Sequence, residues 1–292
     1  MKISPAVPLA GILLATILAP PAEPRFSRAR LSTGVQLRYA EQGDSTGDPL
    51  ILLHGYSDSW FSFSRVLPLL PGNYRVYALD QRGHGDSERP ATGYHMRDLA
   101  ADVLAFMDAR GIARATIVGH SMGGFVAQQV ALLAPHRVVS LVLLNTGRSI
   151  HTFTGAADLK LAVDALTEPV NEAFVREFQA STVHEPVPPE FMDTVVAESR
   201  KLPVRVWQEL MAGMFATEPA SALGRARIPA LVAWGEHDAF VPRAEVDALI
   251  AMLGNATLKV YANTGHTPHW ERPAEFAADL QSFLSGAGAG TR

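Results

Sequence analysis

The chain has 292 residues, of which 48% are hydrophobic, and it contains no cysteine. The lack of cysteine excludes disulfide bonds, thiolate metal sites and a cysteine nucleophile, and a formal net charge of -4 without a basic run argues against nucleic acid as a partner. The length is sufficient for one large hydrophobic core, or for a core with a small appendage.

The first 24 residues differ in composition from the rest of the chain. Lys2 is followed by an apolar run from Ala6 to Ala19 and then by small residues and prolines. The run is shorter than the roughly 20 residues of a membrane-spanning helix, so no stable span is expected. We interpret residues 1–24 as a signal peptide for export to the periplasm or the medium. The alternatives are an uncleaved N-terminal anchor, or a start placed upstream of the true one in a cytoplasmic protein.

After this leader, short extended segments alternate with helical ones. Apolar runs and alternating patterns predict strands at 35–43, 49–55, 74–80, 115–119, 138–145, 229–235 and 256–262. Helical spacing of apolar residues predicts helices at 96–111, 123–135, 243–254 and 273–284. Strand–helix alternation of this kind predicts an α/β fold, with a mostly parallel sheet flanked by helices on both faces.

A long insertion, residues 147–225, interrupts this alternation with segments of helical character. One of them carries four large side chains that look exposed: Trp207, Met211, Met214 and Phe215. Core packing is the ordinary explanation for such a stripe. However, an insertion between the carboxyl end of one strand and the start of the next lies over the ligand-binding edge of the sheet. We therefore expect a helical cap or lid, whose underside lines a pocket with some of these side chains.

The predicted organisation has four parts. Residues 25–146 and 226–286 form the core, and residues 147–225 form the cap. Residues 1–24 are the leader, and residues 287–292 are expected to be a disordered tail because they have no large apolar side chain to bury.

The segment "GHSMG", residues 119–123, lies between a predicted strand and a predicted helix. This is the glycine-x-serine-x-glycine elbow in the context that it requires. The turn is so tight that larger side chains at Gly119 and Gly123 would collide with neighbouring chain. We predict that Ser121 is a nucleophile, held in a strained backbone conformation with its hydroxyl above the sheet.

A serine hydroxyl needs a base to take its proton and an acid to orient that base. His266 follows the last predicted strand, so it emerges at the same sheet edge as Ser121; His269 is the nearest alternative. Asp238, after the preceding strand, is the predicted acid, with Glu236 as its local alternative. The order serine, acid, histidine is the one that this architecture requires.

Two backbone N–H groups are expected to form the oxyanion hole. Met122 directly follows the nucleophile, and Tyr56 lies in the loop "HGYSDSW" after the strand at 49–55. No metal and no cofactor are required by this set of residues.

With these motifs the chain resembles the α/β-hydrolase family, in the capped branch that contains esterases, lactonases and cofactor-free perhydrolases. The matching stretches, besides the elbow, are "LLHGYSDSW", "ALDQRGHGDS", "LVAWGEHDAFVP" and "GHTPHWERPAEFAADLQSFL". The resemblance implies a cap inserted after the sixth strand and a bracing role for the loop of Asp80 and Arg82. A second acid position used in some relatives, after the strand at 138–145, holds Asn145, which cannot carry a charge.

The resemblance and the residues imply an acyl-enzyme on Ser121, formed from a small, mainly apolar carboxylic ester or lactone. A serine at the elbow argues against epoxide hydrolases and haloalkane dehalogenases, which use a carboxylate. Two alternatives stay open: a perhydrolase with the same triad, and a non-enzymatic receptor on the same fold. Nothing in the sequence predicts the oligomeric state.

Overall fold

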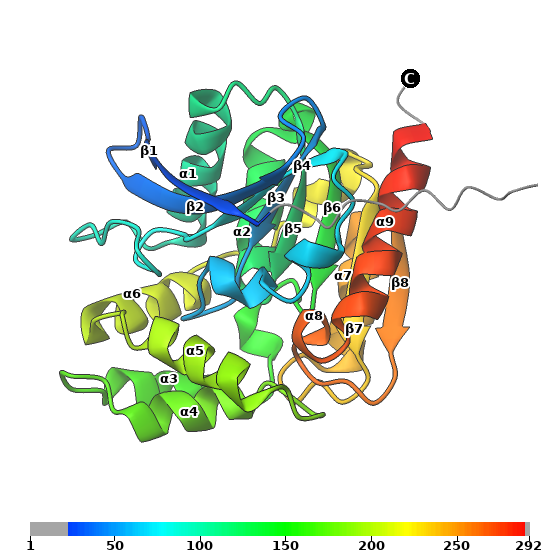
Figure 1. The fold of residues 1–292 in the computed structure, drawn as a ribbon. Helices are drawn as coiled ribbons and strands as arrows, with labels where there is room; N and C mark the ends of the chain where they lie inside the picture. Colours follow the sequence, from blue (N-terminus) through cyan, green and yellow to red (C-terminus); the bar gives the residue numbers. More distant parts are fainter. Residues whose placement is uncertain (1–22, 290–292) are drawn as a thin grey trace, which may run out of the picture.

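The computed structural model describes residues 23–289, which form one twisted eight-stranded sheet covered by helices (Figure 1). The strands are β1 (Arg25–Arg30), β2 (Gln36–Gly43), β3 (Asp48–Leu53), β4 (Tyr74–Leu79), β5 (Ala115–His120), β6 (Val138–Leu144), β7 (Ala230–Gly235) and β8 (Ala256–Tyr261). Their order in the sheet is β1-β2-β4-β3-β5-β6-β7-β8. The pairs β1/β2 and β2/β4 are antiparallel and the other neighbours are parallel, which confirms the predicted mostly parallel sheet.

The central strands are apolar on both faces because helices cover both faces. In β3, Ile51 and Leu53 belong to the larger core cluster, while Leu50 and Leu52 belong to a second cluster on the opposite face. Successive side chains of a strand point to opposite faces, so one short apolar run supplies both cores.

The core helices are α1 (Met96–Ala109), α2 (Met122–Leu133), α7 (Arg243–Leu253), α8 (Pro268–Glu271) and α9 (Pro273–Ala289). Side chains of α1, α2 and α7 pack in the larger cluster, and those of α9 pack in the second one. None of the described helices is long and apolar enough to cross a membrane.

Four helices lie between β6 and β7, the place predicted for the cap. They are α3 (Ala156–Asp164), α4 (Glu172–Ala180), α5 (Pro189–Ser199) and α6 (Val204–Phe215). In Figure 1 they form a separate group at the end of the sheet toward which the arrow of β8 points, the carboxyl end of the parallel strands.

The sequence interpretation missed one strand and ended one helix too early. The residues of β1 are mostly exposed and polar, so they carry no apolar signal, and they form an antiparallel edge strand. The prediction of a disordered tail from residue 287 is wrong as far as Ala289, because α9 continues to that residue. A helix that is already formed extends at little cost, since each added residue contributes one hydrogen bond. The predicted leader falls almost entirely on residues 1–22, outside the described residues.

The loop after β4 is tied to α1 by a buried ion pair. Arg82 Nε and Nη2 donate to Asp102 Oδ2 at 2.5 Å and Oδ1 at 2.6 Å, and both side chains are almost fully buried. Removing one partner leaves an uncompensated buried charge.

We expect Asp102→Ala to lower the free energy of unfolding by about 3–5 kcal/mol. Asp108→Ala on the same helix is the matched control, because its ion pair with Arg137 is at the surface, with 65% of the aspartate side chain exposed. That control should cost less than about 1 kcal/mol. Urea unfolding of both variants checks the difference, and equal losses would contradict the structural role of the pair.

Candidate active site

Ser121 stands at the turn between β5 and α2 with φ 49° and ψ −114°, a conformation that side chains other than glycine rarely adopt. Its backbone is held on both sides. Ser121 N–H donates to Leu144 O at 2.9 Å, and Thr146 Oγ1 donates to Ser121 O at 2.9 Å. The strain predicted for the elbow is therefore present, and the neighbouring strand maintains it.

The two elbow glycines are required by close backbone contacts. A Cβ at Gly119 would lie 2.2 Å from Gly123 O, and one at Gly123 would lie 2.3 Å from Leu53 O. Real Cβ atoms do not approach backbone oxygens so closely, so any larger residue would displace the turn and with it Ser121.

His266 and Asp238 meet at the carboxyl edge of the sheet, where the loops after β8 and β7 emerge. His266 Nδ1 lies 3.0 Å from Asp238 Oδ1 and 2.9 Å from Oδ2. The carboxylate is fully buried and also accepts the backbone N–H groups of Phe240 at 2.8 Å and Val241 at 3.1 Å. These donors stabilise its charge, so it can orient the imidazole and stabilise an imidazolium.

Asn145, directly after β6, cannot carry a charge and is therefore no candidate for the acid. It nevertheless binds the carboxylate of Asp238 directly. Its Nδ2 donates to Asp238 Oδ2 at 2.7 Å and to Gly265 O at 3.2 Å. Its φ of 41° turns the chain sharply at this point. The signal that could have revealed it is its position at the carboxyl end of a parallel strand, beside the strand that leads to Asp238.

Ser121 and His266 line the same pocket. Within residues 23–289 no hydrogen bond joins Ser121 Oγ to the His266 ring. Such a bond commonly tightens only once substrate is present.

The two predicted oxyanion donors lie on either side of the elbow. In the described part of the chain, no protein acceptor takes the N–H of Tyr56 or of Met122. Met122 opens α2, so its N–H belongs to the unsatisfied first turn and faces developing negative charge at a helix N-terminus. The Tyr56 hydroxyl donates to Trp207 O in the cap at 2.7 Å, which fixes the loop under the cap.

The pocket above Ser121 is mainly apolar. Its lining consists of Tyr56, Ser121, Ile150, Phe153, Leu159, Phe178, Thr182, Met211, Met214, Phe240 and His266. Of the four cap residues expected there, Met211 and Met214 line the pocket, while Trp207 and Phe215 do not. Trp207 is fully buried and packs edge-on against Tyr56 and Phe178, and Phe215 packs against His151.

The other histidines near the elbow have different surroundings. The ring of His120 is buried, and its Nε2 lies 2.9 Å from His266 O. His269 points to Ser62, with 3.0 Å between Nε2 and Oγ, and it is absent from the pocket lining. Burial lowers the pKa of His269 to about 3, so a neutral structural ring is its expected state at neutral pH.

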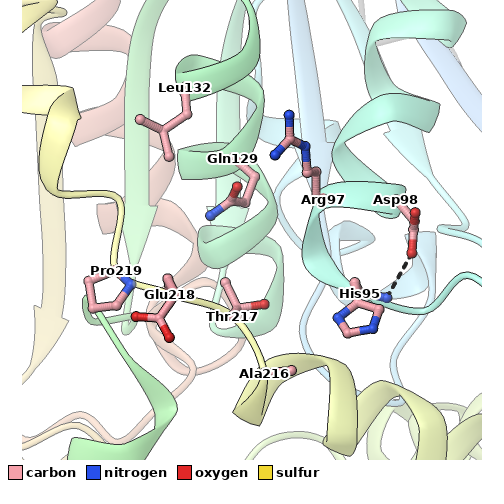
Figure 2. A pocket seen from close by; sticks show the side chains of 9 residues that line it. All are labelled: His95, Arg97, Asp98, Gln129, Leu132, Ala216, Thr217, Glu218 and Pro219. Carbon is pink, nitrogen blue, oxygen red and sulfur yellow. Dashed lines mark hydrogen bonds between the residues drawn. The ribbon is translucent and has the colours of Figure 1, made fainter.

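A second hollow lies away from Ser121, between the C-terminal end of the cap and helices α1 and α2 (Figure 2). Its charged side chains include Arg97, Asp98 and Glu218. The only bond drawn there joins His95 N–H to Asp98 Oδ2 at 3.1 Å and caps the start of α1. No serine lines this groove, so it does not compete with Ser121 as a nucleophile site.

Comparisons with known proteins agree on one family. Residues 50–279 match the model of the alpha/beta hydrolase family. The chain is 31% identical to a non-heme chloroperoxidase of Streptomyces lividans, over 87% of this chain and 97% of the relative. It is also 31% identical to 2-hydroxy-6-oxononadienedioate/2-hydroxy-6-oxononatrienedioate hydrolase 2 of Pseudomonas putida, over 89% and 96% of the two chains.

A solved structure shows the same likeness in three dimensions. The esterase RhEst1 from Rhodococcus sp. superposes with a TM-score of 0.78 at 26% identity, covering 89% of this chain and 98% of that one. The chain thus belongs to the alpha/beta hydrolase family, and it is a hydrolase.

Proposed function

We propose that the protein cleaves small, mainly apolar carboxylic esters or lactones through an acyl-enzyme on Ser121. The observation that carries this proposal is the placement of Ser121 and an Asp238-bound His266 on one apolar pocket. His266 Nε2 takes the proton of Ser121 Oγ as that oxygen attacks the acyl carbon. The N–H groups of Tyr56 and Met122 bind the oxyanion, and each such donor is worth roughly 3 kcal/mol in the transition state.

The cycle then closes with water. His266 gives the proton to the alcohol oxygen as the bond between that oxygen and the acyl carbon breaks, and a water molecule then attacks the acyl carbon while His266 accepts its proton. The bond between the acyl carbon and Ser121 Oγ breaks, Oγ takes the proton back from His266, and the carboxylic acid leaves. Turnover of a panel of esters and lactones by the purified protein tests this proposal, and inactivity on the whole panel would contradict it.

A second candidate uses the same residues with peroxide in place of water, as in a cofactor-free perhydrolase. It is favoured by the similarity to the non-heme chloroperoxidase of Streptomyces lividans. Halogenation in carboxylate buffer with hydrogen peroxide, measured beside ester hydrolysis, separates the two candidate functions. The perhydrolase hypothesis predicts halogenation at a rate comparable to that of ester hydrolysis.

The pocket walls should determine which acyl group is accepted. Met211 lines the pocket and is almost fully buried, so Met211→Trp adds bulk inside it. We expect the ratio of kcat/KM for an octanoyl ester to that for an acetyl ester to fall about tenfold or more. Each methylene group that a hydrophobic pocket no longer accommodates costs about 1–3 kcal/mol of transition-state binding.

Phe215→Trp is the matched control, because Phe215 lies on the same helix outside the pocket lining. Its ratio should stay within about twofold of that of the unmodified protein. A Met211→Trp enzyme with an unchanged ratio would show that the acyl group lies elsewhere.

A further inference from the structure

A small recess, lined in part by polar side chains, lies beside Ser121, next to the apolar pocket. We define it by Asp58, His120 and Gln179, and Ser121 and His266 also line it. Its free space fits about one water molecule or a similarly small group, because a water needs only about 10–15 Å3 of space for its centre.

Asp58 is a buried carboxyl group with incomplete neutralisation. It is 4% exposed, and its Oδ1 accepts from Gln179 Nε2 of the cap at 3.1 Å. Its Oδ2 accepts a long bond from Ser62 Oγ at 3.3 Å. Within residues 23–289 no lysine or arginine pairs with it, and the nearest basic group is His120, whose Nδ1 lies 3.9 Å from Oδ2. Burial raises the pKa of Asp58 to about 7.

His120 presents a bare nitrogen to this carboxyl group. Its Nε2 must carry the proton, because its neighbour at 2.9 Å is the His266 carbonyl oxygen, which can only accept. In the neutral ring Nδ1 is therefore an acceptor, and burial keeps the pKa of His120 well below its usual range. Nδ1 is buried and makes no hydrogen bond in the described part of the chain.

When Asp58 is ionised, the recess therefore holds two facing acceptors, Asp58 Oδ2 and His120 Nδ1, at a separation too long for a direct hydrogen bond. A small molecule with an O–H group satisfies one of these acceptors by donating a hydrogen bond to it.

We propose that this recess is the acyl-acceptor subsite, in which Asp58 and His120 hold the small hydroxylic molecule that attacks the acyl-enzyme. The inference rests on the proposed function, since it concerns the second half of that reaction. Asp58 is a positioning residue: the acceptor donates one O–H to the recess and its other O–H proton to His266 Nε2. Its oxygen then bonds to the acyl carbon, the bond from that carbon to Ser121 Oγ breaks, and Oγ regains the proton from His266.

This arrangement discriminates by the number of O–H groups. Water and hydrogen peroxide have two, so they can satisfy the recess and His266 together. Methanol has one, so when it donates that O–H to His266 it can donate to neither Asp58 Oδ2 nor His120 Nδ1. The protein should therefore transfer its acyl group to water in strong preference to methanol.

The test is the partition of one acyl-enzyme between water and added methanol, measured with a p-nitrophenyl ester as the ratio of free acid to methyl ester. Asp58→Asn replaces an acceptor oxygen with an NH2 donor of the same size. We expect this ratio to fall at least tenfold, while the burst of p-nitrophenol from acylation changes less than threefold. The ratio is a competition within each active molecule, so a merely destabilised variant would not change it.

Asp98→Asn is the matched control, because Asp98 lines the second hollow, away from Ser121. We expect it to leave the ratio of free acid to methyl ester within twofold of that of the unmodified protein. An unchanged ratio in Asp58→Asn, with a normal burst, overturns the subsite and leaves the proposed function intact. An unmodified protein that releases no p-nitrophenol at all overturns both.

A second measurement needs no variant. The titratable groups that face Asp58 are His120 on β5, His266 after β8 and, through Ser62, His269 on α8. Deprotonation of Asp58 with rising pH supplies the acceptor, so the ratio of acid to methyl ester should rise severalfold between pH 6 and 8. His266 serves as the base for both acceptors, so a change in its activity affects both products equally and cancels in the ratio. A flat ratio over this range contradicts the subsite.

Discussion

Ser121→Ala should abolish ester turnover, with kcat falling by about 10^5–10^6-fold, the loss typical of removing a serine nucleophile. The other two hydroxyl groups of the described pocket lining are already engaged: Thr182 Oγ1 donates to Gln179 O and the Tyr56 hydroxyl donates to Trp207 O, both at 2.7 Å. Steady-state kinetics on the best ester of the panel measures the effect. Cleavage at even one hundredth of the original rate would refute the assignment of Ser121.

The same variant should fold normally. Within residues 23–289 the Ser121 hydroxyl makes no hydrogen bond, and the bonds that hold the turn use its backbone N–H and C=O. The substitution therefore removes no stabilising side-chain contact, and the melting temperature should stay within about 2 °C. A large shift would mean that lost activity reflects lost structure.

Asp238→Asn should lower kcat by about 10^4-fold with little change in KM, because an amide in place of the carboxylate imposes the wrong imidazole tautomer. The oxygens of Asp238 accept from Asn145, Phe240 and Val241. The substituted amide keeps its oxygen toward the two backbone N–H groups and turns its NH2 toward His266 Nδ1. The ring proton then moves to Nε2, which can no longer accept the proton of Ser121.

Asn145→Ala is the matched control for that prediction. It deletes one hydrogen bond to the carboxylate, at 2.7 Å, but leaves the charge in place. A hydrogen bond to a charged group is worth about 1.5–3 kcal/mol, so kcat should fall by about 10- to 150-fold. Equal losses in the two variants would contradict the tautomer argument.

The elbow and its partners could be predicted from the sequence because their positions follow from local rules. A strand, a tight turn with two glycines and a helix fix Ser121, and the carboxyl ends of parallel strands bring His266 and Asp238 to the same edge. The antiparallel edge strand β1 escaped prediction, since "RFSRAR" is half charged and exposed.

The remaining differences come from contacts between distant segments. The helical spacing of Trp207 and Met211 places them on one face of a helix, but their exposed look in the sequence is wrong, because both are buried. The spacing also does not show that Met211 lines the pocket while Trp207 packs against Tyr56. Likewise, Asp58 and Gln179 are 121 positions apart, and only the packing of α4 on the loop after β3 brings them within 3.1 Å. Periodicity contains no information on such pairings.

The most direct test of the account is the site of labelling by a fluorophosphonate, read by mass spectrometry of the digested protein. We expect one adduct, on Ser121, that forms rapidly in the unmodified protein and at least a hundredfold more slowly in Asp238→Asn. A protein that stays unlabelled, as a receptor with an inactive triad would, or an adduct on a different residue, would contradict it.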